Sequence, residues 1–141
     1  MILNPKLLIV DDERGIVDMI QSYFQTQYDI LTAYSGQEAL KKVACKPDLI
    51  LLDINMPGMD GFEVLRAMNA NHTIEDIPVI MISSEDSDAT IRRSYELGAS
   101  DYVNRPFDAR IVYRRVTNTI KLYAKQRRLV QMVSDQIRAR E

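Results

Sequence analysis

Short apolar runs alternate with amphipathic segments along this chain of 141 residues. Runs of three to six residues are typical of buried β-strands, whereas the intervening segments repeat their apolar residues at helical spacing. The predicted strands are Leu7–Val10, Tyr28–Ala33, Leu49–Asp53, Pro78–Ser83 and Asp101–Val103. The predicted helices are Gly15–Thr26, Ser35–Ala44, Gly61–Ala70, Asp86–Leu97 and a last helix that starts from Asp108.

This alternation predicts an α/β fold, a doubly wound five-stranded parallel sheet with helices on both faces. The second strand is the most amphipathic, because polar Asp29 and Thr32 interrupt its apolar residues, and this favours an edge position. We therefore predict the strand order 2-1-3-4-5. In this order the first and third strands are neighbours, so their carboxyl ends meet where the topology reverses.

Several residues are typical of helix ends. Ser35 and Glu38 have the spacing of a capping box, Asp108 is a predicted N-cap, and Gly98 has the position of a C-terminal cap. The single cysteine, Cys45, excludes an internal disulfide and a thiolate zinc site, which fits a reducing cytosol. We expect Cys45 to be a small apolar residue on the inner face of a helix.

Charge is distributed unevenly along the chain. Residues 110–141 carry nine Lys or Arg against two acids, so with a total of −2 the first 109 residues carry −9. An acidic body argues against direct nucleic-acid binding. No apolar stretch approaches the roughly 20 residues that span a bilayer, and Met1–Lys6 has no signal-peptide core. We therefore predict a cytoplasmic protein without membrane contact.

Carboxylates stand at two predicted strand ends. Asp53 ends the third strand, and Asp11 and Asp12 follow the first. Like charges brought together raise one another's pKa, and a hard cation such as Mg²⁺ removes that cost. The backbone carbonyl of Asn55 is a further candidate ligand. The alternative for Asp11 and Asp12, a solvated turn that caps the first helix, is disfavoured because Asp53 lies at the neighbouring strand end.

A carboxylate beside Mg²⁺ can act as a nucleophile towards phosphorus and form an acyl phosphate. Two more strand ends offer groups that would hold the phosphoryl oxygens. Ser83 offers a hydroxyl and Arg105 a permanent cation. Taken alone, Ser83 is equally well explained as a helix cap or turn residue, and Arg105 as a surface charge.

From about Leu7 to Tyr123 the chain resembles the receiver domain of bacterial two-component response regulators, of the chemotaxis type. The motifs that carry the resemblance are Leu8–Glu13, Asp53–Gly61, Pro78–Ser83 and Leu97–Phe107. The resemblance implies that Asp53 accepts a phosphoryl group from a histidine kinase or phosphotransfer protein. It implies an Mg²⁺ site made by Asp12, Asp53 and the Asn55 carbonyl, with Asp11 holding a coordinated water. Ser83 and Tyr102 would be switch residues, and the Arg105–Pro106 bond would be cis.

The chain departs from the family pattern at Arg105, where the family has lysine, and at Ser84, where alanine is usual. Arginine keeps the charge but changes its geometry, so we expect phosphate uptake with a weakened conformational response. One alternative is a pseudo-receiver that signals through protein contacts alone. Another is an aspartyl-nucleophile phosphatase of haloacid-dehalogenase type, which Asn55 opposes because that chemistry needs an acid there. We therefore predict a regulatory phosphoacceptor and not an enzyme.

The last helix continues past the end of a receiver. We predict a receiver domain over residues 1–123 and a coiled-coil-like extension over residues 124–141, a linker to an output domain absent from this chain. Positions spaced alternately by three and four form a heptad seam that predicts a parallel homodimer. The seam residues are Val112, Val116, Thr119, Tyr123, Gln126, Val130, Val133 and Ile137. The basic residues lie mainly off the seam, which is typical of solvated helix flanks.

Overall fold

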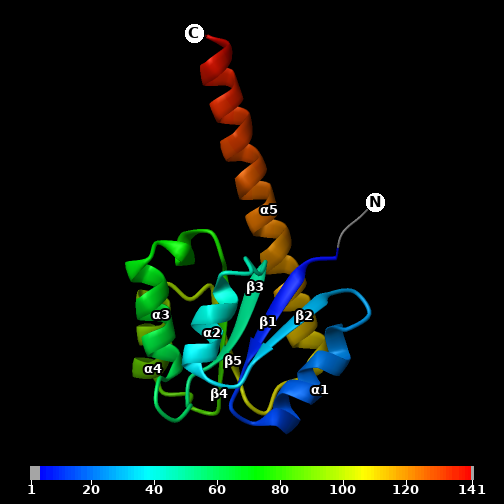
Figure 1. The fold of residues 1–141 in the computed structure, drawn as a ribbon, viewed down its shortest axis with the longest axis vertical. Coiled ribbons are helices and arrows are strands. Elements are labelled where there is room, and N and C mark those ends of the chain that lie inside the picture. The colour runs from blue at the N-terminus through cyan, green and yellow to red at the C-terminus, as the bar shows by residue number, and fades with distance from the viewer. Residues whose placement is uncertain (1–3, 141) are drawn as a thin grey trace.

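The computed structural model describes residues 4–140, so residues 1–3 and 141, at the outer ends of the two predicted domains, lie outside it. Five strands alternate with five α-helices (Figure 1). The strands are β1 Lys6–Val10, β2 Asp29–Ala33, β3 Leu49–Asp53, β4 Val79–Ser83 and β5 Asp101–Asn104. The helices are α1 Arg14–Phe24, α2 Gly36–Val43, α3 Gly61–Ala70, α4 Asp88–Glu96 and α5 Ala109–Ala139, with a 3₁₀ turn, η1, at Thr73–Glu75.

All strand pairs are parallel, and the order is β2-β1-β3-β4-β5, which confirms the predicted fold and topology. β3 and β4 are buried at every position, because helices cover both faces of the sheet. β2 is only partly buried, as expected for the edge strand.

The hydrophobic core has two layers, one on each face of the sheet. On one face α1 and α5 pack against the sheet, and Phe24 stacks on Tyr113 with 5.2 Å between ring centroids. On the other face the side chains of α2 and α3 pack with Met81 and Tyr102 of the sheet. Alternate side chains of each strand enter opposite layers, which explains why continuous apolar runs are needed in the central strands.

The predicted helix ends are largely confirmed. The Ser35 hydroxyl accepts the Glu38 N–H, Asp108 accepts the Arg110 N–H, and Gly98 ends α4 with a φ of +104°. The prediction for Cys45 is wrong: this residue is exposed and lies beyond the end of α2. The helix stops at Val43, so the helical periodicity that would turn Cys45 inward does not reach it.

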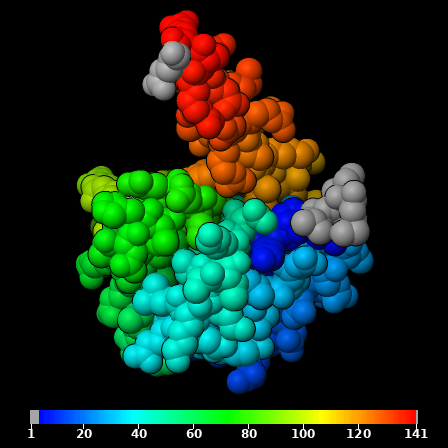
Figure 2. Space-filling model, turned by 45° about the horizontal axis from the view of Figure 1, so that its top comes forward, coloured from blue at the N-terminus to red at the C-terminus, as the bar shows by residue number. Residues whose placement is uncertain are grey.

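Helix α5 is 31 residues long, about 46 Å at 1.5 Å per residue. It passes behind the sheet in Figure 1 and projects beyond the edge where the strands begin, as Figure 2 also shows. Val112 and Val116 are fully buried in the core, and the Tyr123 hydroxyl lies 3.1 Å from that of Ser100. Beyond residue 124 every described side chain of α5 is exposed.

This placement corrects part of the seam prediction. The seam residues Val112 and Val116 pack inside their own domain and are not available to a partner helix. Only the projecting end of the seam remains exposed. None of the helices in residues 4–140 is both long and apolar enough to cross a membrane.

Candidate functional site

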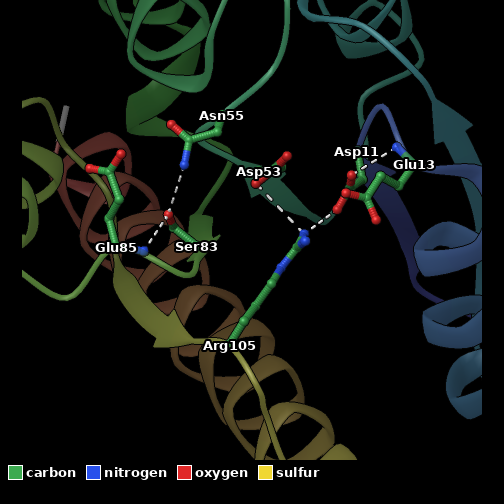
Figure 3. A network of polar contacts seen from close by, with 7 residues as sticks. All are labelled: Asp11, Glu13, Asp53, Asn55, Ser83, Glu85 and Arg105. Carbon is green, nitrogen blue, oxygen red and sulfur yellow. Dashed lines mark hydrogen bonds and ion pairs between the residues drawn. The ribbon is translucent and has the colours of Figure 1, made fainter.

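Strand register builds the site at the carboxyl edge of the sheet. Val10 pairs with Leu52, so the next residues along, Asp11 and Asp53, leave neighbouring strands side by side. The same logic applies on the other side of Asp53, because Ser83 pairs with Asn104 and the chain then continues directly into Arg105. Four predicted site residues therefore lie at the carboxyl ends of four neighbouring strands, β1, β3, β4 and β5 (Figure 3). They are Asp11, Asp53, Ser83 and Arg105.

Three carboxylates converge there. Asp11, Asp12 and Asp53 each offer an oxygen, and these oxygens all lie within 4.8 Å of one another. Asp11 and Asp53 are buried, whereas Asp12 is exposed. The Asp11 Oδ1 accepts the Glu13 backbone N–H at 3.0 Å, which fixes that carboxylate at the start of α1. The predicted convergence of the acidic residues is thus found in the structure.

The pKa of Asp53 is raised from an ordinary 3.8 to about 7, first by burial and then by the negative charges of Asp11 and Asp12. The Arg105 guanidinium and a hydrogen bond from the Asn55 backbone act in the opposite direction. Burial dominates because a carboxylate loses its hydration when it leaves water. A cluster with this charge is stabilised by a hard cation with oxygen ligands, so the donor set fits Mg²⁺.

Arg105 reaches across the edge of the sheet into the acidic cluster. Its Nη2 donates to Asp11 Oδ2 and lies 3.6 Å from Asp53 Oδ1 (Figure 3). The Nε atom is buried and lacks a hydrogen-bond partner among the described residues. The surface-charge interpretation of Arg105 is therefore wrong, because the side chain is only 19% exposed and contacts buried carboxylates. The bond to Pro106 is cis, as the resemblance implied.

Ser83 lies on the other side of Asp53, fully buried. Its Oγ accepts the Glu85 backbone N–H at 3.1 Å, and the Asn55 side-chain amide lies 3.5 Å away. Tyr102 is also buried, and its hydroxyl donates to the backbone carbonyl of Glu85. Ser83 and Tyr102 therefore both bind the backbone of Glu85, in the loop between β4 and α4.

One residue of the site was not predicted. Gly61 begins α3 directly beneath the end of β3, where an added Cβ would lie 2.5 Å from the Asp53 carbonyl oxygen and 2.9 Å from the Ile54 Cα. Only glycine permits this approach, and the Gly61 N–H donates to the Ile54 carbonyl at 2.9 Å. The sequence signal was Asp60, which caps α3 by accepting the Glu63 N–H and places the next residue at the first turn.

Comparisons with known proteins agree with this geometry. The sequence model of the response regulator receiver domain family matches residues 7–117. The chain is 40% identical over 116 residues to the alkaline phosphatase synthesis transcriptional regulatory protein PhoP of Bacillus subtilis (strain 168). This match covers 81% of the chain and 48% of PhoP, so the chain spans about half the length of that curated relative.

Solved structures show the same fold. The chemotaxis protein CheY4 of Vibrio cholerae is 29% identical, with a TM-score of 0.77 over 83% of this chain and 99% of CheY4. The receiver domain of a LuxO repressor protein from Vibrio parahaemolyticus is 28% identical, with a TM-score of 0.83 over 91% of this chain and 98% of that domain. The chain therefore belongs to the response regulator receiver domain family, whose members are regulatory signalling domains with a flavodoxin-like fold.

Proposed function

We propose that the chain is a phosphoacceptor switch in which Asp53 takes a phosphoryl group from a histidine kinase or phosphotransfer protein. The observation that carries the proposal is the position of Asp53, a buried carboxylate between two further acids and a guanidinium. In the transfer, an Asp53 oxygen forms a bond to phosphorus while the bond from phosphorus to the donor's histidine nitrogen breaks. The product is an acyl phosphate on Asp53 and a free histidine on the donor.

Mg²⁺ would be held by Asp12, Asp53 and the Asn55 backbone carbonyl, with Asp11 holding a coordinated water, and when bound it would neutralise charge on the transferring oxygens. The chain's own residues supply the remaining contacts. The Nε–H of Arg105 finds no acceptor within residues 4–140, and a phosphoryl oxygen on Asp53 would provide one. This supports a role for Arg105 in holding the phosphoryl group.

Ser83 and Tyr102 are the proposed switch residues. If the Ser83 hydroxyl turned from the Glu85 N–H towards a phosphoryl oxygen on Asp53, it would release the loop between β4 and α4. The Tyr102 hydroxyl binds the same loop through the Glu85 carbonyl. The change at Asp53 would thereby reach α4 and β5. This route depends on two hydrogen bonds that share one residue.

The projecting part of α5 is the proposed output element, acting through a parallel homodimer and a coupled output domain. Three seam residues there, Val130, Val133 and Ile137, are 67%, 55% and 55% exposed, although they are apolar. A second copy of the same helix would cover them by coiled-coil packing. Leu129, 60% exposed, lies beside this seam and would widen the contact.

Intact-mass spectrometry after treatment with a small phosphodonor and Mg²⁺ tests the proposal. The wild-type chain should gain the mass of one phosphoryl group, and Asp53→Asn should gain none. Asp76→Asn is the matched control, because this exposed aspartate precedes β4 at the opposite edge of the sheet. Wild-type protein that stays unmodified under conditions that modify another receiver would refute the proposal and favour a pseudo-receiver.

A further inference from the structure

We propose that the projecting part of α5 binds a second copy of the chain through a seam centred on Leu122 and Leu129, and that a hydrogen bond between Ser100 and Tyr123 selects this seam. The inference rests on the proposed function, because it concerns the parallel homodimer proposed there. It goes further by naming the face of α5 that meets the partner and the contact that sets this face. The new seam replaces Tyr123 and Val130 of the predicted seam by the residue before each of them.

The predicted seam continues the face of α5 that packs on its own sheet. Val116 is fully buried, and Tyr123 and then Val130 follow it at intervals of seven residues, which is close to two helical turns. Where α5 leaves the domain, the body lies beside this face, since Glu75 of η1 lines a cleft together with Tyr123 and Val130. A partner helix centred on Tyr123 would therefore meet η1 before it could pack.

A hydrogen bond fixes how α5 is turned about its own axis at this point. The hydroxyl oxygens of Tyr123 and Ser100 lie 3.1 Å apart. Ser100 is itself held at the start of β5, because its N–H donates to the Val79 carbonyl at 2.8 Å. Turning Tyr123 towards a partner would break this contact, so the residue stays on the side of the body.

Leu122 and Leu129 lie on a neighbouring face that the body leaves open. Their side chains are 53% and 60% exposed, although both are large and apolar. Gln126 and Val133 follow these two leucines at the same spacing, so the four positions alternate by four, three and four residues. This is the spacing of a heptad seam, and a second copy of the same helix is the occupant that such a seam fits.

The remaining exposed apolar side chains of the projecting part border this seam. Val130 and Ile137 lie along one border and Met132 along the other, and each of them is more than half exposed. In a parallel pair of helices the two kinds of border are adjacent, so Met132 would face Ile137 of the partner subunit. Gln126 would face its own copy, and a single polar residue in a seam favours a parallel, in-register pair.

Disulfide formation in the full, unphosphorylated chain tests which face meets the partner. The exposed Cys45 is first replaced in a Cys45→Ala background, so that each variant has one thiol. Leu129→Cys and Val130→Cys form a matched pair, because they lie next to each other on α5 but on different seams. We expect Leu129→Cys to cross-link about tenfold faster under mild oxidation, since a disulfide requires closely spaced Cα atoms.

The role of the hydrogen bond is tested by adding Tyr123→Phe, which removes only the hydroxyl. The preference for Leu129→Cys over Val130→Cys should fall to about twofold, as expected for the loss of one hydrogen bond. Tyr113→Phe is the matched control, since it makes the same change on the same helix at a ring that stacks on Phe24, and it should leave the preference unchanged. Circular dichroism melting of each variant checks that the fold is retained.

Cross-linking of Val130→Cys that is as fast as that of Leu129→Cys would overturn the inference, restore the predicted seam and leave the proposed homodimer standing. A preference that Tyr123→Phe leaves unchanged would overturn the role of the hydrogen bond. Cross-linking at neither position would overturn the inference together with the homodimer. The phosphodonor experiment decides the phosphoacceptor role separately, since it reads modification of Asp53.

Discussion

Replacing Asp53 by asparagine should stabilise the folded protein at neutral pH when divalent cations are chelated. The cause is the pKa of Asp53, which burial and the charge of Asp11 raise from an ordinary 3.8 to about 7. A buried carboxylate with a raised pKa is costly once it is ionised. Asparagine has nearly the same shape and carries no charge at any pH, so it avoids that cost.

The sign follows from proton binding in the two states. Below about pH 4 Asp53 is protonated in both the folded and the unfolded chain, and the group contributes nothing. As pH rises from about 4 to about 7 the unfolded chain releases the proton while the folded chain keeps it, so the free energy of unfolding falls. One pKa unit corresponds to about 1.36 kcal/mol, so a shift of about three units costs up to about 4 kcal/mol above pH 7. We expect Asp53→Asn to raise the free energy of unfolding above pH 7 by about 2–4 kcal/mol, because it removes most of this cost.

Urea unfolding at several pH values with EDTA present measures the effect. The free energies of unfolding of wild type and Asp53→Asn should converge near pH 4 and diverge as pH rises to about 8. Asp76→Asn, which changes an exposed aspartate, should stay close to wild type throughout. A variant at position 53 that is no more stable than wild type at pH 8 would refute the reasoning.

Three further outcomes test the packing and the assembly. Gly61→Ala should destabilise the protein by about 2–3 kcal/mol in thermal melts and slow phosphate uptake, because the added Cβ would meet the Asp53 carbonyl oxygen. Gly15→Ala is the control: a Cβ added there has no atom within 4 Å, so this change should be neutral or stabilising. Phe24→Ala should cost about 3–5 kcal/mol in urea unfolding, since Phe24 is fully buried, and the same change at the neighbouring Tyr23, which is 38% exposed, should cost much less. If the proposed dimer forms, Val133→Asp should abolish it in light scattering without lowering the melting temperature. A wild type that is monomeric at high concentration would contradict the proposed dimer.

The comparison of sequence with structure shows which features are local. Strands such as Leu49–Asp53 could be predicted because burial on both faces requires an uninterrupted apolar run, and helix ends because caps such as Ser35 satisfy nearby N–H groups. The order and direction of the strands then extend the prediction from single elements to the functional site. Since parallel strands end at one edge, carboxylates placed directly after two neighbouring strands must meet.

The sequence by itself determined the fold class, the strand order and the convergence of Asp11, Asp12 and Asp53, because each depends on periodicity or on position relative to a strand end. Tertiary structure alone decided that Arg105 binds Asp11, that Gly61 lies against Asp53, and that the first half of the α5 seam packs inward. These contacts depend on how far a side chain reaches and on which helix face the sheet covers. Neither quantity is fixed by local spacing, since both arise only when distant segments pack together.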